Sequence, residues 1–256
     1  ISLRGELEDY AFQNNFLKKK IFLNLFKRIY NKAQFFHYTT NKEKIKSEKI
    51  LKKKYRYEIF PNYIAKEVLK MKKTKIRDRY LYLGRIHPKK NIETIIGSFK
   101  KFVEESRSSK KLFIVGSGEA SYVKKLKDLV NKFELNKKII FTGKKNYVSK
   151  FDLINRSKFL LFFSKTENFG NVVLESLACR TPVIVGNNLP WIVIKKYKAG
   201  YFINNNINSL TKSLIEVESL SVKKYKKLQK NSQKLINNFF IENKIEDIFK
   251  IYKNYL

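Results

Sequence analysis

The sequence predicts an α/β protein in which a doubly wound parallel sheet follows a partial, mostly helical N-terminal segment. From residue 80 onward, short and continuously apolar runs alternate with amphipathic stretches, as buried parallel strands alternate with covering helices. Hydrophobic residues make up 43% of the 256 residues, which is enough for a packed core. The turn signal Pro61-Asn62 separates this alternating region from a lysine-rich segment, as expected at a domain boundary.

The segment before this turn is predicted to contain a basic amphipathic helix over Phe12–Tyr30. Its apolar positions recur at steps of three, four and seven residues, and lysines lie around them. These apolar positions are Phe12, Phe16, Leu23, Phe26 and Tyr30. Such a helix either lies on an anionic membrane surface or packs on its own domain, and packing is the commoner outcome. A short strand over Gln34–Thr40, a lysine-rich helix and the run Tyr55–Ile59 follow.

The alternating region contains a series of predicted strands: Tyr80–Leu83, Leu112–Val115, Ile139–Phe141, Phe159–Phe163, Pro182–Val185 and Tyr201–Ile203. Helices are predicted between them over Ile92–Val103, Tyr122–Phe133, Val148–Ile154 and Asn171–Cys179. Helical patterns then dominate from Ile207 to Leu256. Ligands of such sheets bind at the carboxyl ends of the strands, so the residues that follow each strand are the candidates for a site.

Lys and Arg total 56 against 22 Asp and Glu, a net charge of +34. This balance attracts polyanions such as nucleic acid, anionic lipids or phosphorylated substrates. The lysines are nevertheless spread along the whole chain among many Asn and Ile, as an AT-rich genome would encode, which favours a solvated surface. No reading helix or aromatic-stacking motif supports a specific nucleic-acid partner.

The cellular compartment is indicated by what the sequence contains. The single cysteine, Cys179, excludes a disulfide framework and fits a reducing compartment. No apolar run approaches the roughly 20 residues of a membrane span. We therefore expect a cytoplasmic protein, at the inner face of the plasma membrane if the basic helix binds lipid. Because the chain begins at Ile1, we expect it to be part of a longer polypeptide.

Cations and glycines follow the first two strands of the alternating region. Arg85 and Lys90 lie near a helix start, where a guanidinium fork, an ammonium and helix amides can clamp a diphosphate. Gly116 and Gly118 follow the next strand, and glycines allow a backbone to approach a ligand closely. Each signal is weak alone, since Lys and Arg are abundant and Gly-x-Gly also suits an ordinary turn.

The most informative segment runs from Ser164 to Cys179. A buried strand leads into Glu167, a glycine-containing turn and a helix that carries Glu175 eight positions later. A continuous helix would place the two carboxylates about 12 Å apart. One could lie near a ribose and the other near a pendant sugar, with the amides of Asn168–Val172 facing phosphates between them. Spacing alone supports a second interpretation equally well. In that interpretation Glu167 is an ordinary loop residue and Glu175 pairs with a lysine.

This segment resembles the E-x7-E motif of family-4 glycosyltransferases, with Glu167 and Glu175 as the two acidic residues. Other elements of that family follow in order: Gly84-Arg85 with Lys90, Val115–Gly118, Phe141–Gly143, Thr181–Ile184, Pro190-Trp191 and Gly200. The resemblance covers residues 60–240. It implies a GT-B fold, in which two Rossmann-like domains face each other and the C-terminal one holds a nucleotide-sugar.

The resemblance also implies the roles of these residues. Arg85 and Lys90 would neutralise the diphosphate of a UDP- or GDP-sugar as its charge develops. Glu175 would accept hydrogen bonds from the ribose, and Glu167, the catalytic-site acid, would hold the sugar near its anomeric carbon. The remaining residues of the implied donor site are Gly116, Gly118, Gly143, Asn168, Phe169, Gly170, Asn171 and Val172. The family retains anomeric configuration and uses no metal or other cofactor.

The implied division places a remnant of the acceptor-side domain at residues 1–62, the donor domain at 63–238 and a C-terminal helix at 239–256. The family's N-terminal domain normally exceeds a hundred residues, so we expect only its last portion in this chain. His37 lies too late to be that domain's site histidine and is interpreted as structural, and His87 as a loop residue. Arg180 replaces a common Gly, and Val193 a common Glu. The implied reaction is sugar transfer to a surface-glycan or lipid-linked acceptor. The first alternative is a non-catalytic nucleotide-sugar-binding subunit that needs a separate acceptor domain, and the second, less favoured, is a basic nucleic-acid-binding protein.

Overall fold

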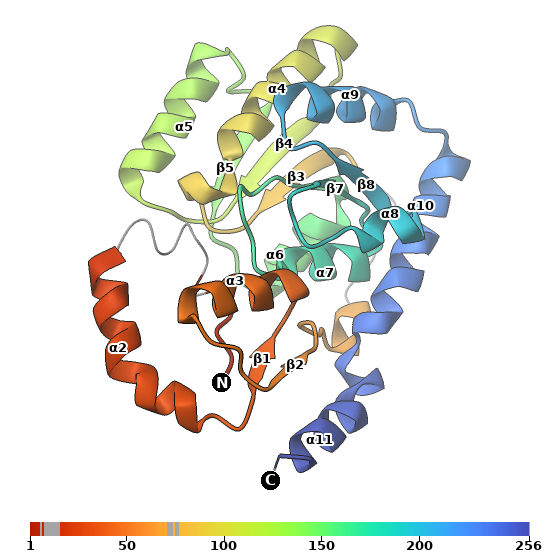
Figure 1. The fold of residues 1–256 in the computed structure, drawn as a ribbon. Coiled ribbons are helices and arrows are strands. Elements are labelled where there is room, and N and C mark those ends of the chain that lie inside the picture. Colours follow the sequence, from red (N-terminus) through yellow and green to blue (C-terminus); the bar gives the residue numbers. More distant parts are fainter. Residues whose placement is uncertain (6, 8–15, 71–73, 75–76, 256) are drawn as a thin grey trace.

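The computed structural model describes residues 1–5, 7, 16–70, 74 and 77–255. Its main feature is a six-stranded parallel sheet with the strand order β5-β4-β3-β6-β7-β8 (Figure 1). The strands are β3 (Arg79–Leu83), β4 (Lys111–Val115), β5 (Ile139–Gly143), β6 (Ser157–Phe162), β7 (Val183–Gly186) and β8 (Gly200–Ile203). The predicted doubly wound parallel sheet is therefore confirmed.

Helices cover both faces of this sheet, as Figure 1 shows. One face carries α4 (Ile92–Ser106), α5 (Ala120–Lys132) and α9 (Ile207–Glu218). The other carries α6 (Tyr147–Asn155), α7 (Asn171–Ala178), α8 (Val193–Tyr197) and α10 (Val222–Ile236).

Consecutive side chains of one strand enter different cores, which explains the uninterrupted apolar runs. In β3, Tyr80 packs edge-on against Phe102 of α4 with ring centroids 5.6 Å apart, whereas Leu81 belongs to the cluster that contains Leu174 of α7. Side chains alternate between the faces of a strand, so a strand that is covered on both faces must be apolar at every position.

The strand order reverses between β3 and β6, and these two strands pair in parallel with each other. The connections after these two strands leave the sheet toward opposite faces, which opens a crevice at their carboxyl ends. The loop after β3 contains the short 3₁₀ helix η2 (Pro88–Lys90), and the loop after β6 leads into α7. The fold thus brings the two strongest sequence motifs to one edge of the sheet.

The N-terminal segment contains α2 (Phe16–Lys32), β1 (Phe36–Tyr38), α3 (Asn41–Leu51) and β2 (Tyr57–Ile59). The helix predicted over Phe12–Tyr30 is described from Phe16 and continues to Lys32; residues 12–15 lie outside the described part of the chain. β1 and β2 form a separate two-stranded parallel sheet. The described part of the segment is therefore mostly helical, as predicted, and its two short strands pair only with each other.

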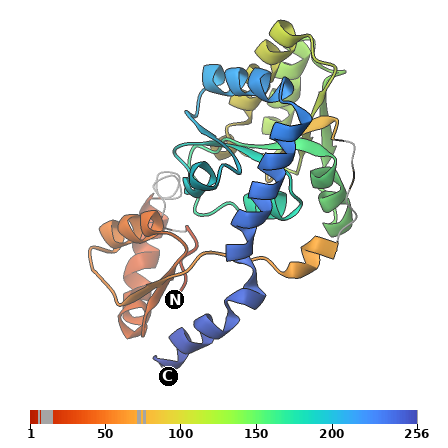
Figure 2. The same ribbon diagram turned by 90° about the vertical axis from the view of Figure 1, so that its right-hand side faces the viewer.

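The end of the chain returns to this N-terminal segment, as Figure 2 shows. After α10 come the 3₁₀ turns η3 (Asn237–Phe239) and η4 (Ile241–Asn243) and then α11 (Ile245–Lys253), so the C-terminal helix expected from residue 239 begins at Ile245. The Tyr255 hydroxyl donates to Glu58 Oε1 at 2.7 Å, and the Tyr255 ring lies 4.2 Å from that of Phe35. The 3₁₀ turn η1 (Lys66–Lys70) lies in the connection to the main sheet.

Candidate functional site

An ion pair joins the loops after β3 and β6. Lys90 Nζ donates to Glu167 Oε2, and Ser164 Oγ donates to the same oxygen at 3.3 Å. The two backbones are also linked, because the Lys165 amide donates to the Lys89 carbonyl at 2.8 Å. The side chains of Lys90 and Glu167 are only 17% and 16% exposed, so the charges meet where water screens them little. The structure thus brings together two residues that the sequence places 77 positions apart.

The N-terminus of α7 begins beside this ion pair. Gly170 precedes the helix with φ +91°, and a Cβ there would lie 2.6 Å from the Phe162 ring, so only glycine fits. Trp191 Nε1 donates to the Phe169 carbonyl at 2.5 Å and so fixes the backbone of the turn. A first helical turn has amide N–H groups without intrahelical partners and a positive dipole end, which suits an anion.

A cavity of about 340 Å³ opens at this edge. The main domain contributes Tyr82, Leu83, Gly84, Lys90, Phe162, Glu167, Asn168, Phe169, Gly170, Asn171 and Val172 to its lining. Arg4 and Asn62 line it from the N-terminal segment. The cavity therefore lies between the carboxyl edge of the main sheet and the N-terminal segment, and it holds most of the residues that the sequence motif singled out.

Arg85 and Glu175 lie next to the cavity without lining it. Arg85 is exposed and follows the lining residue Gly84, and its carbonyl accepts from the Tyr82 hydroxyl at 2.7 Å. Glu175 lies on α7, whose first residues Asn171 and Val172 line the cavity, and its Oε1 accepts from Lys150 Nζ at 2.8 Å. Each predicted carboxylate is therefore paired with a lysine from a neighbouring connection.

The glycines after β4 allow the loop after β4 to pack closely against the loop after β3. A Cβ on Gly116 would lie 1.8 Å from the Gly84 carbonyl oxygen, and one on Gly118 would lie 1.9 Å from that of Ile86. These contacts support the loop that carries Lys90. Gly143 differs, because a Cβ there would meet no atom within 4 Å, although its φ of +69° favours glycine. Gly116 and Gly118 therefore allow their backbone to approach the loop that carries Lys90, and they act on the site through that loop.

Three asparagines that the sequence did not single out bracket the end of β6. Asn205 Nδ2 donates to the carbonyls of Phe163 and Ser164 at 3.1 and 3.0 Å, and to Asn188 Oδ1 at 2.9 Å. Asn188 Nδ2 donates to the carbonyls of Ser164 and Lys165 at 3.1 and 2.6 Å. Asn91 Nδ2 donates to Asn205 Oδ1 at 3.2 Å. The bracket joins the loops after β3, β7 and β8 and fixes the backbone just before Glu167.

We predict that Asn205→Ala destabilises the protein by about 1–3 kcal/mol, because it leaves carbonyls at the strand end without donors. Chemical denaturation with urea would measure this change. Asn208→Ala is the matched control, since Asn208 Oδ1 accepts an exposed hydrogen bond from Lys101 at 3.1 Å. Equal stability of the two variants would show that the bracket contributes nothing.

The N-terminal segment contacts the site loops through polar groups. With its amide nitrogen turned toward Glu43, Asn168 donates to that carboxylate at 3.0 Å and accepts from Thr39 Oγ1 at 3.0 Å. Lys42 Nζ donates to the Asn188 carbonyl at 2.7 Å, and Asn62 Nδ2 donates to Asn171 Oδ1 at 2.8 Å. The Asn168 side chain therefore holds the two parts of the protein together at the site.

Both histidines and the cysteine have structural surroundings. The His37 ring stacks on Phe60 at 3.8 Å and its Nε2 contacts the Phe60 carbonyl at 2.8 Å, while burial lowers its pKa. His87 Nδ1 accepts from the Lys89 amide at 3.1 Å and so caps η2. Burial raises the pKa of the Cys179 thiol to about 12, which keeps it neutral. The interpretation of His37 as structural and of His87 as a loop residue agrees with these contacts.

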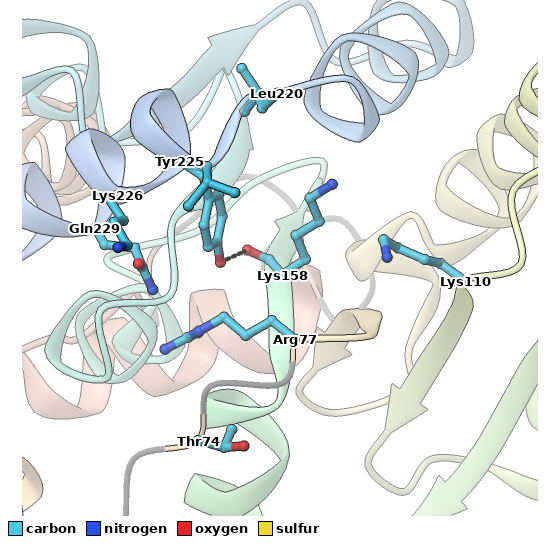
Figure 3. A pocket seen from close by; sticks show the side chains of 9 residues that line it. Thr74, Arg77, Lys110, Lys158, Leu220, Tyr225, Lys226 and Gln229 are labelled. Carbon is cyan, nitrogen blue, oxygen red and sulfur yellow. Dashed lines mark hydrogen bonds between the residues drawn. The ribbon is translucent and has the colours of Figure 1, made fainter.

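A larger cavity, of about 680 Å³, lies at the opposite, amino ends of the strands (Figure 3). Its polar groups serve the fold: Arg77 donates to the Ser157 carbonyl at 3.0 Å, and the Tyr225 hydroxyl donates to the Lys158 carbonyl at 2.8 Å. Burial would raise the pKa of Glu218, but Lys158 and hydroxyl donors hold it below its usual value. We therefore assign this cavity a structural role.

Comparisons with known proteins identify the family and the fold. Residues 64–235 match the family described as Glycosyl transferases group 1. The alpha-monoglucosyldiacylglycerol synthase of Streptococcus pneumoniae is 28% identical over 180 residues, which cover 66% of this chain and 40% of that relative. The chain thus spans less than half the length of this relative.

Solved structures share the fold. Sucrose-phosphate synthase from Thermosynechococcus elongatus superposes with a TM-score of 0.81 at 17% identity, over 97% of this chain and 65% of its own. Anabaena HepE, solved in complex with UDP and glucose, superposes with a TM-score of 0.76 at 14% identity, over 92% and 66%. Both likenesses show the GT-B glycosyltransferase fold. Because the family match covers more than half of the chain, this protein belongs to the group 1 glycosyltransferases.

Proposed function

We propose that the cavity at the carboxyl edge binds a UDP- or GDP-sugar and that the chain forms the donor-binding half of a retaining hexosyltransferase. The observation that carries the proposal is the Lys90–Glu167 pair beside the N-terminus of α7. An ammonium and free helix amides suit a diphosphate, and a carboxylate suits sugar hydroxyls. The ion pair supplies both chemistries in one place.

In this proposal, donor binding breaks the ion pair between Lys90 and Glu167. Lys90 turns from Glu167 to the diphosphate, and Arg85, which is exposed at the rim, adds a second cation. Glu167 is then available to the sugar hydroxyls near the anomeric carbon. Charge grows on the diphosphate as the bond to the sugar breaks, so cations and amides already in position lower the barrier. No metal ion is invoked, because these groups meet the developing charge.

The acceptor is proposed to enter from the side of the N-terminal segment. Arg4 and Asn62 line the cavity from the N-terminal segment, so we expect a sugar held by Glu167 to lie beside this segment. We propose a surface-glycan or lipid-linked acceptor, and the lipid-linked class is supported by the likeness to the pneumococcal alpha-monoglucosyldiacylglycerol synthase. A chain that binds the donor without releasing nucleoside diphosphate would instead be a donor-binding subunit that needs a separate acceptor domain.

The test is a thermal-shift panel of nucleoside diphosphates and their sugars on the wild-type chain and on Glu175→Ala, followed by an assay of nucleoside diphosphate release. We expect one base series to raise the Tm, with a smaller rise in the variant, since ligands that bind only the native state stabilise it in proportion to their affinity. If no nucleotide in the panel raises the Tm of the wild-type chain, the proposed donor site is wrong.

We further propose that α2 binds an anionic membrane surface. Its inner face packs Tyr30 and Leu23 into the core of the N-terminal segment, but Ile21, Leu25 and Ile29 are 60%, 71% and 53% exposed at helical spacing. Exposed cations on the same helix include Lys27, Arg28 and Lys32. Within the described ranges, no helix is both long enough and apolar enough to span a bilayer. A helix that is apolar on its outer face and basic beside it fits a lipid interface.

We predict that Leu25→Ser combined with Ile29→Ser weakens binding to phosphatidylglycerol-containing vesicles by about tenfold or more, because less apolar area enters the interface. Co-sedimentation measures this change. Ile45→Ser is the matched control, since Ile45 is 66% exposed on α3. Binding that is the same for anionic and neutral vesicles, or that Ile45→Ser reduces equally, would contradict the assignment of α2.

A further inference from the structure

The second carboxylate of the motif is held by a lysine that the motif does not include. Glu175 Oε1 accepts from Lys150 Nζ at 2.8 Å, and the two side chains are 21% and 23% exposed. Lys150 comes from α6, which follows the edge strand β5, whereas Glu175 comes from α7, which follows β6. The ion pair therefore ties together two connections that leave the sheet at its carboxyl edge.

The ammonium of Lys150 is itself held in place by aromatic rings. Nζ lies 4.8 Å from the centroid of the Phe151 ring and 5.3 Å from that of Tyr147. Phe151 is fully buried, and its ring lies 4.7 Å from that of Tyr147. A cation between two rings is attracted by both. Lys150 is thus a fixed anchor for Glu175, unlike a mobile surface lysine.

The ion pair with Lys150 uses one carboxylate oxygen of Glu175, Oε1, and leaves the other, Oε2, available as a hydrogen-bond acceptor. Among the residues that the structure describes, none donates a hydrogen bond to Oε2. An ionised carboxylate can accept about four hydrogen bonds, so Glu175 retains capacity for hydroxyl donors. Glu175 follows Asn171 by one helical turn, about 6 Å along the axis. A diphosphate at the start of α7 therefore places the attached ribose near Glu175.

We propose that Lys150 is a positioning residue of the donor site, which fixes the Glu175 carboxylate to receive the ribose hydroxyls and offsets its charge toward the diphosphate. This inference rests on the proposed donor-binding function. The offset is necessary because an unpaired carboxylate, partly shielded from water, would repel the anionic nucleotide. Lys150 acts through Glu175, so its loss is expected to have two effects. The uncompensated carboxylate weakens binding of every nucleoside diphosphate, and the loss of positioning also reduces the preference for a ribose hydroxyl.

The test measures the affinity of the full chain for uridine and guanosine diphosphates and for their 2′-deoxy and 3′-deoxy analogues by calorimetry. In the wild-type chain, loss of a ribose hydroxyl should weaken binding about tenfold or more, as for a hydrogen bond to a charged group. In Lys150→Met this ratio should fall below about threefold, as it should in Glu175→Gln. Lys150→Arg should keep the wild-type ratio, because a guanidinium can still pair with Glu175.

Two controls separate positioning from stability. Lys124→Met removes a lysine that pairs with Asp128 at 2.9 Å on the exposed surface of α5, and it should leave the ratio unchanged. The reversal Lys150→Glu with Glu175→Lys restores an ion pair and should recover Tm, but not the preference for ribose. If the wild-type chain prefers ribose and Lys150→Met keeps the full preference, the inference is overturned while the proposed function stands. If the wild-type chain binds neither diphosphate, both fail.

Discussion

Replacing Gly118 by alanine should destabilise the protein by more than about 4 kcal/mol, or prevent folding, because the new methyl group has no room. Its Cβ would lie 1.9 Å from the Ile86 carbonyl oxygen and 2.9 Å from the Ile86 Cβ. Ile86 cannot move away easily, since it is buried and its amide donates to the Ser117 carbonyl at 2.8 Å. Relief requires displacement of the loop that carries Lys90, so a variant that folds should also lose donor affinity.

Gly143→Ala is the matched control for this prediction. Gly143 lies at the same edge of the sheet, but a Cβ there meets no atom within 4 Å, and only its φ of +69° opposes a side chain. That conformation costs an alanine about 1–2 kcal/mol. Urea denaturation of both variants gives the comparison. If Gly118→Ala is no less stable than Gly143→Ala, the close packing of the β3 and β4 loops is wrong.

Lys90→Met should weaken donor binding about 100-fold, which is the largest functional effect that we expect of a single substitution. The variant loses a charge-assisted hydrogen bond to the diphosphate, and it leaves Glu167 without its counter-ion beside that anion. Removing Glu167 as well should recover part of the affinity, because the repulsion disappears. Calorimetry of Lys90→Met, and of Lys90→Met with Glu167→Gln, separates the two contributions.

Lys165→Met is the control for Lys90→Met. Lys165 belongs to the same loop as Glu167 and is exposed, and only its backbone amide takes part in the contact with Lys89. The substitution removes one positive charge from the neighbourhood and leaves the ion pair intact. Comparable losses in Lys165→Met and Lys90→Met would indicate a general effect of charge, with no specific place for Lys90.

The predicted sheet was correct because its strands follow one physical rule. A strand that is buried on both faces is apolar at every position, and this run is visible in Phe159–Phe163 without knowledge of its neighbours. The proximity of Lys90 and Glu167 follows from the parallel arrangement of the strands, because the carboxyl ends of parallel strands lie at one edge of the sheet. By contrast, β2 has three residues and α8 five, too few for a periodic pattern.

The parts of the site that the sequence did not predict depend on side-chain direction. Asn188 and Asn205 bracket the end of β6, but in the sequence they are two asparagines among many in polar loops. The predicted donor-site residue Asn168 directs its side chain to Glu43, which the sequence placed in a lysine-rich helix. Lys150 likewise could not be distinguished from its many neighbours until α6 and α7 were placed side by side.

The most direct test of the donor site is hydrogen exchange of the backbone amides with and without a saturating nucleoside diphosphate. We predict slower exchange at the start of α7, from Asn171 to Glu175, and in the loop from Gly84 to Lys90, because the diphosphate and ribose lie there. Lys158 and residues 220–229, at the larger cavity of Figure 3, should be unchanged. Slower exchange around that cavity, with no change at α7, would contradict the account.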